Sequence, residues 1–120
     1  MNKLLIEGIE AFNKGKYYDA HEFWEDIWTD FHIPDKLFIQ GLIQYTVGFF
    51  HIQNDNLRGA KNMFKKCRPK IEKFIENDRK IDTESIIISL DNAESQLIKI
   101  NHAKEFNFKL INKIYLINNY

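Results

Sequence analysis

The sequence predicts an all-α fold, a compact bundle of about five helices built from two helical hairpins. In five segments, apolar residues recur at the three- and four-residue spacing of an amphipathic helix. Turn-forming residues, among them Gly15, Pro34 and the run 54–56, separate these segments. The chain has 120 residues, 44% of them hydrophobic, which is the size of one domain with a buried core. We therefore expect residues 1–120 to form a single helical domain.

The first hairpin is expected to join helices at 2–14 and at about 17–31. Gly15 ends the first helix and opens the turn. The second helix should end before Pro34, because a proline disfavours helical geometry in the residue that precedes it.

The second hairpin is expected to join helices at 36–53 and 57–76. The helix at 36–53 is apolar almost all round, which predicts a central, buried position, and Asp35 is placed to cap it. Pro69 falls inside the apolar pattern of the helix at 57–76 and should kink or split it.

A fifth helix is expected at 83–101, capped by Asp82 or Thr83, and a tail follows at 103–120. The tail fits two patterns, since its apolar residues first alternate and then take a helical spacing. We expect an extended start followed by a short helix.

The two hairpins, which together span residues 1–76, are related by an internal repeat at an offset of 40 residues. In each copy a short turn is followed by a large apolar residue and then by alanine, as in tetratricopeptide-like repeats. Two copies are too few for a solenoid, so we expect a compact bundle. The corresponding pairs are Gly8 and Gly48, Tyr17 and Leu57, Ala20 and Ala60, Phe23 and Met63, and Trp24 and Phe64.

Composition narrows the functional classes. Seventeen basic and seventeen acidic residues cancel, so the overall charge favours neither nucleic acid nor a membrane surface. No apolar run approaches the roughly 18 residues of a membrane-spanning helix, and we expect no membrane partner. The N-terminal residues lack the pattern of a signal peptide, and Cys67 is the single cysteine. We therefore expect a cytoplasmic location, where thiols stay reduced.

The second helix carries the main candidate site residues. Its helical wheel places His21 and Glu25, one turn apart, at the edge of the packing face beside Trp28. On the central helix, Gln40, Gln44 and His51 form a narrow polar stripe. Buried polar groups need hydrogen-bond partners, so we expect this stripe to face the second helix. The six residues would then line a polar cleft between the second and third helices.

Three interpretations of this cleft remain open: a buried hydrogen-bond network that fixes the register of the hairpins, a pocket for a small molecule or a peptide, and a metal site. The metal site would use His21, Glu25 and His51. It lacks the HExxH pattern, because Glu25 stands where the second histidine would be. We therefore expect no metal.

A separate possibility is an anionic partner. Residues 57–80 hold nine Lys or Arg against three acids, whereas residues 1–31 hold three Lys against seven acids. Nucleic-acid binding by the fourth helix is the less favoured alternative, because oppositely charged solvated faces explain the same pattern. It would use Arg58, Lys61, Lys65, Lys66, Arg68 and Lys70.

Several short blocks, in order along about residues 4–76, resemble the prokaryotic family known as domain of unknown function 309. The blocks are Ala20-His21-Glu22-x-Trp24-Glu25-x-x-Trp28, Phe38-x-Gln40-Gly41-Leu42-Ile43-Gln44, His51, and Asn56-x-x-Gly59-Ala60. The resemblance implies a compact all-helical domain with the His-Glu motif inside, and it implies no reaction.

The sequence thus predicts a small binding or interaction domain whose ligand is a small molecule or a peptide. The alternative is a metal-dependent or acid/base hydrolytic enzyme that uses His21, Glu25 and His51. The sequence identifies no cofactor or catalytic residue, and it leaves a homo-oligomer open.

Overall fold

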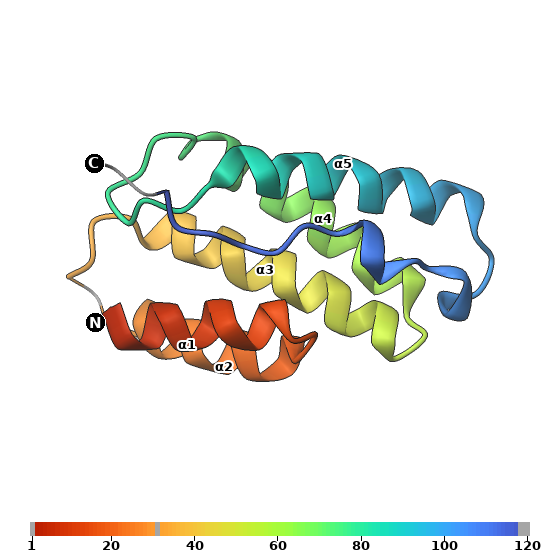
Figure 1. The fold of residues 1–120 in the computed structure, drawn as a ribbon, viewed down its shortest axis with the longest axis horizontal. Helices are drawn as coiled ribbons and strands as arrows, with labels where there is room; N and C mark the ends of the chain where they lie inside the picture. The colour runs from red at the N-terminus through yellow and green to blue at the C-terminus, as the bar shows by residue number, and fades with distance from the viewer. Residues whose placement is uncertain (1, 31, 118–120) are drawn as a thin grey trace.

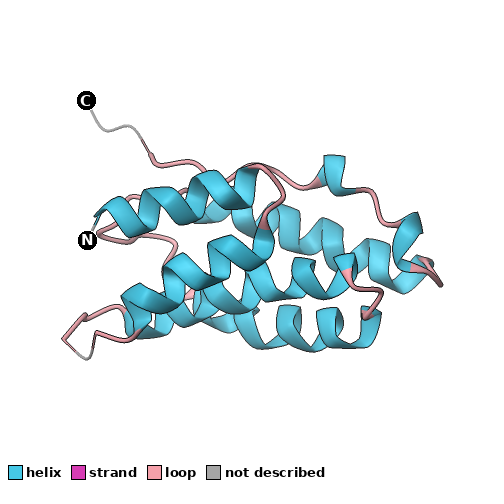
Figure 2. Ribbon diagram, turned by 90° about the horizontal axis from the view of Figure 1, so that it is seen from below, coloured by secondary structure: helices cyan, strands magenta, loops and turns pink. Residues whose placement is uncertain are grey.

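The computed structural model describes residues 2–30 and 32–117, and 70% helix content confirms the predicted all-α bundle. Figure 2 shows the described part of the chain as helices joined by loops. None of the described helices has the length and apolar character needed to cross a membrane. The helices are α1 (Asn2–Asn13), α2 (Tyr17–Trp28), α3 (Lys36–Gln53), α4 (Leu57–Glu72) and α5 (Thr83–Lys99), followed by the single 3-10 turns η1 (Ala103–Glu105) and η2 (Phe108–Leu110).

Each helix packs on the next along the chain, from α1 on α2 to α4 on α5. In Figure 1, α1 and α5 lie on opposite sides of α3, which is the central helix. The prediction of a buried third helix is therefore confirmed. The largest fully buried side chains come mainly from α3 and from the aromatic residues that meet it: Trp24, Tyr45, Phe38, Phe49 and Phe64.

The repeat seen in the sequence is also a repeat of structure. Gly15 has φ +77°, and Asp55, forty residues later, has φ +57°. Both residues close the same helix-ending turn, with Lys16 N donating to Ala11 O and Asn56 N to His51 O at 2.9 and 2.8 Å. Asparagine and aspartate tolerate this left-handed conformation better than most residues with a side chain, so aspartate can replace glycine here.

The corresponding glycines of the two hairpins, Gly8 and Gly48, each lie against an aromatic ring. Gly8 of α1 lies under the indole of Trp24, and Gly48 of α3 lies under the ring of Phe64. At either glycine an added Cβ would lie within 2.5 Å of the ring. The first helix of each hairpin thus leaves room for the bulky residue of the second.

Several helix ends differ from the predictions. The helix at α2 ends at Trp28, and the predicted last residue, Phe31, lies outside the described residues. Pro69 neither splits α4 nor stops it at once, but the helix ends at Glu72, four residues short of the prediction. The helix continues for three residues past Pro69 without the hydrogen bond that the missing N–H of the proline would have donated.

Two capping predictions have different outcomes. Asp82 caps α5, since its side chain accepts a hydrogen bond from Ser85 N. Asp35 stands at the N-cap of α3 but makes no side-chain cap bond. Its carboxylate instead accepts two hydrogen bonds from Arg79, at 2.5 and 2.9 Å, because the planar guanidinium presents two donors in the geometry of a carboxylate.

The tail contains no α-helix within its described residues. After η2, residues 111–117 run extended, and Ile81 and Leu116 form an isolated antiparallel bridge. The order is thus the reverse of the expected one, because the 3-10 turns come first and the extended segment follows, where the short helix was predicted.

Candidate functional site

A small pocket of about 210 Å³ lies between α2 and α3. Tyr18 and His21 of α2 and Val47, Phe50 and His51 of α3 line it. The two helices are antiparallel, because Tyr17 at the start of α2 stacks on Phe49 near the end of α3. The Tyr18 ring lies 5.2 Å from the His21 ring and 5.3 Å from the Phe50 ring. The pocket therefore has largely aromatic and aliphatic walls, with a histidine from each helix.

His21 is held at both ring nitrogens. Its Nε2 lies 2.8 Å from Glu25 Oε1, one helical turn later, and its Nδ1 lies 3.1 Å from the Tyr18 carbonyl oxygen. Both neighbours are acceptors, so only the doubly protonated ring donates to both. The side chains of His21 and Glu25 are 20% and 47% exposed. Glu25 thus orients His21 from the surface rather than from within the pocket.

His51 is oriented by the start of α4. Asn56 caps this helix by accepting a hydrogen bond from Gly59 N at 2.9 Å, which identifies the oxygen of its amide. The amide nitrogen then faces His51 Nδ1 at 3.5 Å and can donate to it. In that arrangement Nδ1 is the acceptor, and the proton of a neutral His51 is on Nε2.

The other three predicted cleft residues lie elsewhere along α2 and α3. The Gln44 oxygen accepts a hydrogen bond from Lys70 Nζ of α4 at 2.8 Å, so Gln44 belongs to the α3–α4 contact. The Lys36 ammonium lies 4.2 Å from the centre of the Trp28 ring and also bonds to the Trp28 carbonyl. Within the described chain, no hydrogen bond is found for the Gln40 side chain, which is half-buried. The structure thus pairs His21 with Glu25 and places His21 and His51 in one pocket, and Gln44 is bonded elsewhere.

Sequence reasoning missed two walls of the pocket. Tyr18 precedes His21 by three residues, so it lies on the same edge of α2, and Phe50 lies beside His51 on α3. Tyr18 and Phe50 directly follow the core residues Tyr17 and Phe49, and these adjacent aromatic residues were the signal available in the sequence. Val47, the third wall, lies about one helical turn from both Gln44 and His51 on α3.

The three residues considered as metal ligands are not grouped around one point. In the part of the chain that the structure describes, no three His, Cys, Asp or Glu side chains are placed to hold one ion. His21, Glu25 and His51 therefore do not constitute a ligand set.

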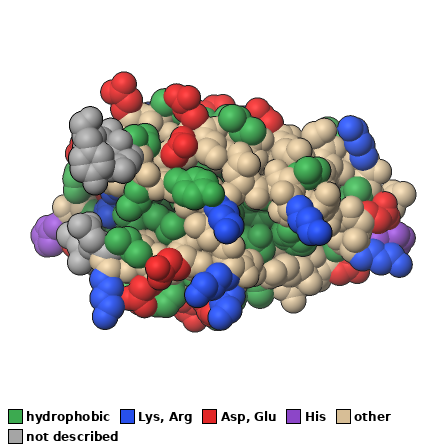
Figure 3. All heavy atoms as spheres, viewed as in Figure 1, with side chains coloured by type: hydrophobic (Ala, Val, Ile, Leu, Met, Phe, Trp, Pro, Cys, Tyr) green, Lys and Arg blue, Asp and Glu red, His purple; other side chains and the backbone are tan. Residues whose placement is uncertain are grey.

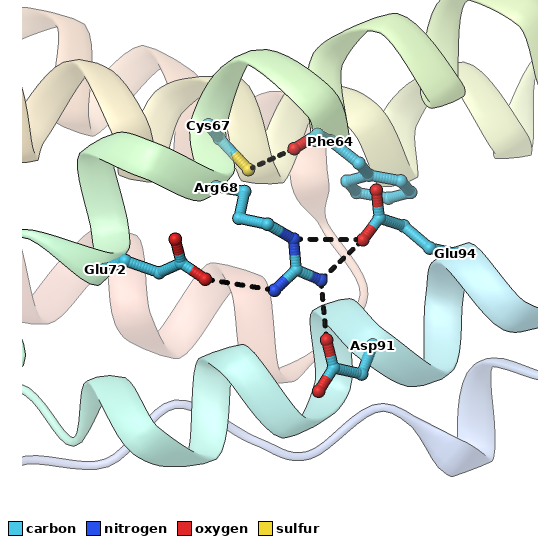
Figure 4. A network of polar contacts seen from close by, with 6 residues as sticks. All are labelled: Phe64, Cys67, Arg68, Glu72, Asp91 and Glu94. Carbon is cyan, nitrogen blue, oxygen red and sulfur yellow. Dashed lines mark hydrogen bonds and ion pairs between the residues drawn. The ribbon is translucent and has the colours of Figure 1, made fainter.

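The basic helix α4 is partly neutralised by α5. Arg68 donates to Glu94 through Nε and Nη2, at 3.2 and 2.5 Å, and to Asp91 at 2.6 Å (Figure 4). Its Nη1 also meets Glu72, one turn along α4, at 3.3 Å. Arg68 and Lys70 are thus engaged within the protein, which leaves Arg58, Lys61, Lys65 and Lys66 of the predicted basic set exposed.

A larger hollow of about 550 Å³ lies between the α2–α3 loop and the α4–α5 loop. The Arg79–Asp35 ion pair lies in its wall, with side chains only 10% and 16% exposed. This pair fastens the two loops to each other. We place the candidate site at the smaller pocket instead, since loop carboxylates dominate the rim of this hollow and its arginine is already paired.

Comparison with known proteins agrees with the resemblance seen in the sequence. No curated protein and no solved structure matches the chain. Residues 5–63, from α1 to the first half of α4, match the family described as Domain of unknown function (DUF309). The match stops short of the expected residue 76, but it contains both helices that form the pocket. This chain is thus similar to the DUF309 family over residues 5–63.

Proposed function

We propose that the protein is a binding domain that receives a small apolar group in the pocket between α2 and α3. The observation that carries the proposal is the pocket itself, with carbon-rich walls and a histidine from each helix. Ligand sites are typically apolar hollows with a few fixed polar groups, and this pocket has that composition.

The size of the pocket limits the ligand. Its 210 Å³ is below the roughly 300–1,000 Å³ of sites for drug-sized molecules. A single aromatic or aliphatic side chain of a peptide, or a metabolite of that size, fits better. Such a side chain in a closed pocket is the usual anchor of a peptide interface.

The histidines supply the polar part of recognition. His51, with Nδ1 facing Asn56, offers an Nε2 donor in its neutral form. His21 is fixed by Glu25 and Tyr18, so its ring loses little freedom when a ligand packs on it. The rival hypothesis, a hydrolytic enzyme, needs a free basic nitrogen on His21, and Glu25 occupies Nε2. We also retain the proposal of a cytoplasmic location, with which the buried thiol of Cys67 agrees.

Fragment binding monitored by methyl NMR tests the proposal. A library of aromatic and aliphatic fragments is added to untagged protein, and we expect some to shift the methyl signals of Val47. The Val47→Phe variant, which lacks these methyl groups, fills the pocket and should abolish fragment binding as observed in the NMR signals of the fragments themselves. Ile98→Phe, at a side chain 82% exposed on α5, is the matched control and should keep that binding. If no fragment moves the Val47 signals in the wild-type protein, the proposal is wrong.

A further inference from the structure

The strip of α3 that borders the pocket carries hydrogen-bond donors. Val47, a wall of the pocket, follows Gln44 and precedes His51 by about one helical turn each. All three side chains are partly exposed. Neutral His51 donates from Nε2, because its Nδ1 faces the amide of Asn56. The apolar wall of the pocket thus lies between two polar side chains on the same face of α3.

The contact with Lys70 fixes the orientation of the Gln44 amide. Lys70 Nζ lies 2.8 Å from Gln44 Oε1, and an ammonium group can only donate, so the bonded atom is the amide oxygen. The amide nitrogen of Gln44 then points elsewhere, and within the described chain it has no acceptor. The ammonium of Lys70 keeps further N–H groups that can donate. The surface beside the pocket therefore offers donors rather than acceptors.

On α3 and α4, no unpaired acid accompanies the positive charge of Lys70. Helix α3 contains no Asp or Glu, and Glu72, the only acid of α4, forms an ion pair within that helix. Glu25 of α2 is paired with His21, and the other acids of α2 are exposed to solvent. Lys66, one turn before Lys70, is exposed and adds positive charge. The face over α1, α5 and the tail differs, since Figure 3 shows acidic and basic side chains scattered across it.

Gly41 allows the stem of Lys70 to lie against α3. A Cβ at position 41 would lie 2.9 Å from Cβ of Lys70 and 3.3 Å from Cγ1 of Ile71. Helices α3 and α4 therefore approach closely here, and Lys70 is half-buried rather than extended into solvent. A lysine held in this way loses less conformational freedom on binding than one on an open surface.

We propose that the ligand of the α2–α3 pocket is a monocarboxylate, whose apolar group fills the pocket and whose carboxylate binds at Gln44 and Lys70. The inference rests on the proposed function, because the apolar group needs that pocket. The two parts of the ligand lie about one helical turn, roughly 5–6 Å, apart. A carboxylate forms charge-assisted hydrogen bonds with an ammonium group, so an acid with a short linker to its apolar group matches the strip. The carboxylate belongs to a free organic acid or to the C-terminus of a peptide with an apolar last residue.

A matched pair of ligands is the first test. The probes are 3-phenylpropionate and 3-phenylpropanamide, which has the same apolar group without the charge, and the readout is the shift of the Val47 methyl signals. We expect the carboxylate to bind at least about tenfold more tightly than the amide. If the amide binds and the carboxylate binds no more tightly, the pocket stands and this inference is overturned. If neither compound binds, this inference is overturned, and the fragment library decides separately whether the pocket proposal fails with it.

Variants of the polar strip are the second test. Lys70→Met keeps the aliphatic stem and should remove most of the preference for the carboxylate without changing the binding of the amide. Lys65→Met removes the same charge at an exposed site about 140° round α4 from Lys70, so it is the matched control and should keep the preference. Equal losses in the two variants would overturn the inference, because the general charge of α4 would then account for the binding.

A substitution on α3 tests the site without removing Lys70. Gln44→Glu can still accept the hydrogen bond of Lys70, but it replaces the free amide donor with a negative charge. This variant should reject 3-phenylpropionate and still bind the amide. Undiminished binding of the carboxylate to Gln44→Glu would overturn the inference.

A pair of peptides distinguishes the two sources of the carboxylate. The probes are an acetylated tripeptide that ends in phenylalanine and the same tripeptide with an amidated C-terminus. Tighter binding of the free-acid peptide than of 3-phenylpropionate assigns the site to the end of a protein chain, and the reverse order assigns it to a small organic acid. Both results support a carboxylate site, whereas a preference for the amidated peptide contradicts it.

Discussion

Replacing Gly8 with alanine should destabilise the protein, even though alanine is the better helix former. A Cβ at position 8 would lie 2.1 Å from Nε1 of Trp24, which is far closer than two non-bonded heavy atoms can approach. Trp24 is fully buried, and its Nε1 donates a hydrogen bond to the Leu5 carbonyl at 3.3 Å. The indole therefore has to move, and the hydrogen bond must break or stretch.

The expected change in the free energy of unfolding combines one stabilising and two destabilising contributions. Alanine in place of glycine in a helix contributes about 1 kcal/mol of stability. Overpacking of a filled core costs about 1–3 kcal/mol, and leaving the buried indole N–H without an acceptor costs about 1–3 kcal/mol. We expect a net loss of about 3 kcal/mol in the free energy of unfolding.

Urea unfolding followed by circular dichroism at 222 nm measures the effect. Ser95→Ala, at an exposed position of α5, is the control and should stay within about 0.5 kcal/mol of the wild type. In a double-mutant cycle, Trp24→Phe should recover part of the loss caused by Gly8→Ala, because the smaller ring leaves room for the new methyl group. A Gly8→Ala variant as stable as the wild type would refute the reasoning about this contact.

Three further changes are expected to be measurable. His21→Ala should lower the free energy of unfolding, measured by chemical denaturation, by less than about 1 kcal/mol, because the Glu25 carboxylate that it pairs with is half exposed. The same variant should lose the NMR response to pocket fragments, and a large loss of stability would indicate a structural role instead. Arg79→Met should cost about 3 kcal/mol by leaving the Asp35 carboxylate buried without its partner, and a double variant with Asp35→Leu should be the more stable of the two. Stability should also fall between about pH 9 and pH 12, because burial raises the pKa of the Cys67 thiol and of the Tyr17 phenol to about 12 each. The fold favours their neutral forms, so this stability is complete below the ordinary pKa values and is lost as the pH rises towards 12; urea unfolding at a series of alkaline pH values checks it, and a flat profile would contradict it.

The helices were predictable where local signals agreed. The bounds of α3 match the prediction because its apolar pattern is bracketed by Pro34 and by the turn at 54–56. The end of α4 was not predictable in this way. Phe74 continues the helical spacing of apolar residues, but it lies past the end of the helix and stacks on Phe38 with ring centres 5.0 Å apart. The spacing of apolar residues predicts that Phe74 is buried, but it does not predict whether the backbone there is helical.

The tail shows a limit of another kind. Its backbone groups bond to the side chains of Asn13 and Gln96, and Asn13 is 101 residues away from Ile114. Helical spacing near the end of the chain suggested a short helix, because local patterns contain no information about such distant acceptors. The tertiary contacts outweighed the weak local preference.

For the candidate site, the sequence predicted which residues are neighbours on one helix, but it did not predict which residues of different helices face each other. His21 and Glu25 lie one turn apart on α2, and their ion pair follows directly from that spacing. The wheel of α3 placed Gln44 in one stripe with His51, but it could not tell which neighbour Gln44 would meet. A helix surrounded on all sides offers polar residues several partners, and here Lys70 of α4 is the one that bonds.

The central position of α3 also keeps the proposed pocket apart from the tail. Val47 lines the pocket with α2, whereas Phe49, about 200° further round the helix, contacts Phe106 and Phe108 of the tail. A fragment in the pocket and the tail would therefore touch opposite sides of α3. Val47→Phe should block the pocket without changing hydrogen exchange in the tail, because Val47 faces α2 on the side of α3 away from the tail. If the tail amides of that variant did exchange faster, α3 would be transmitting strain from the pocket to the tail.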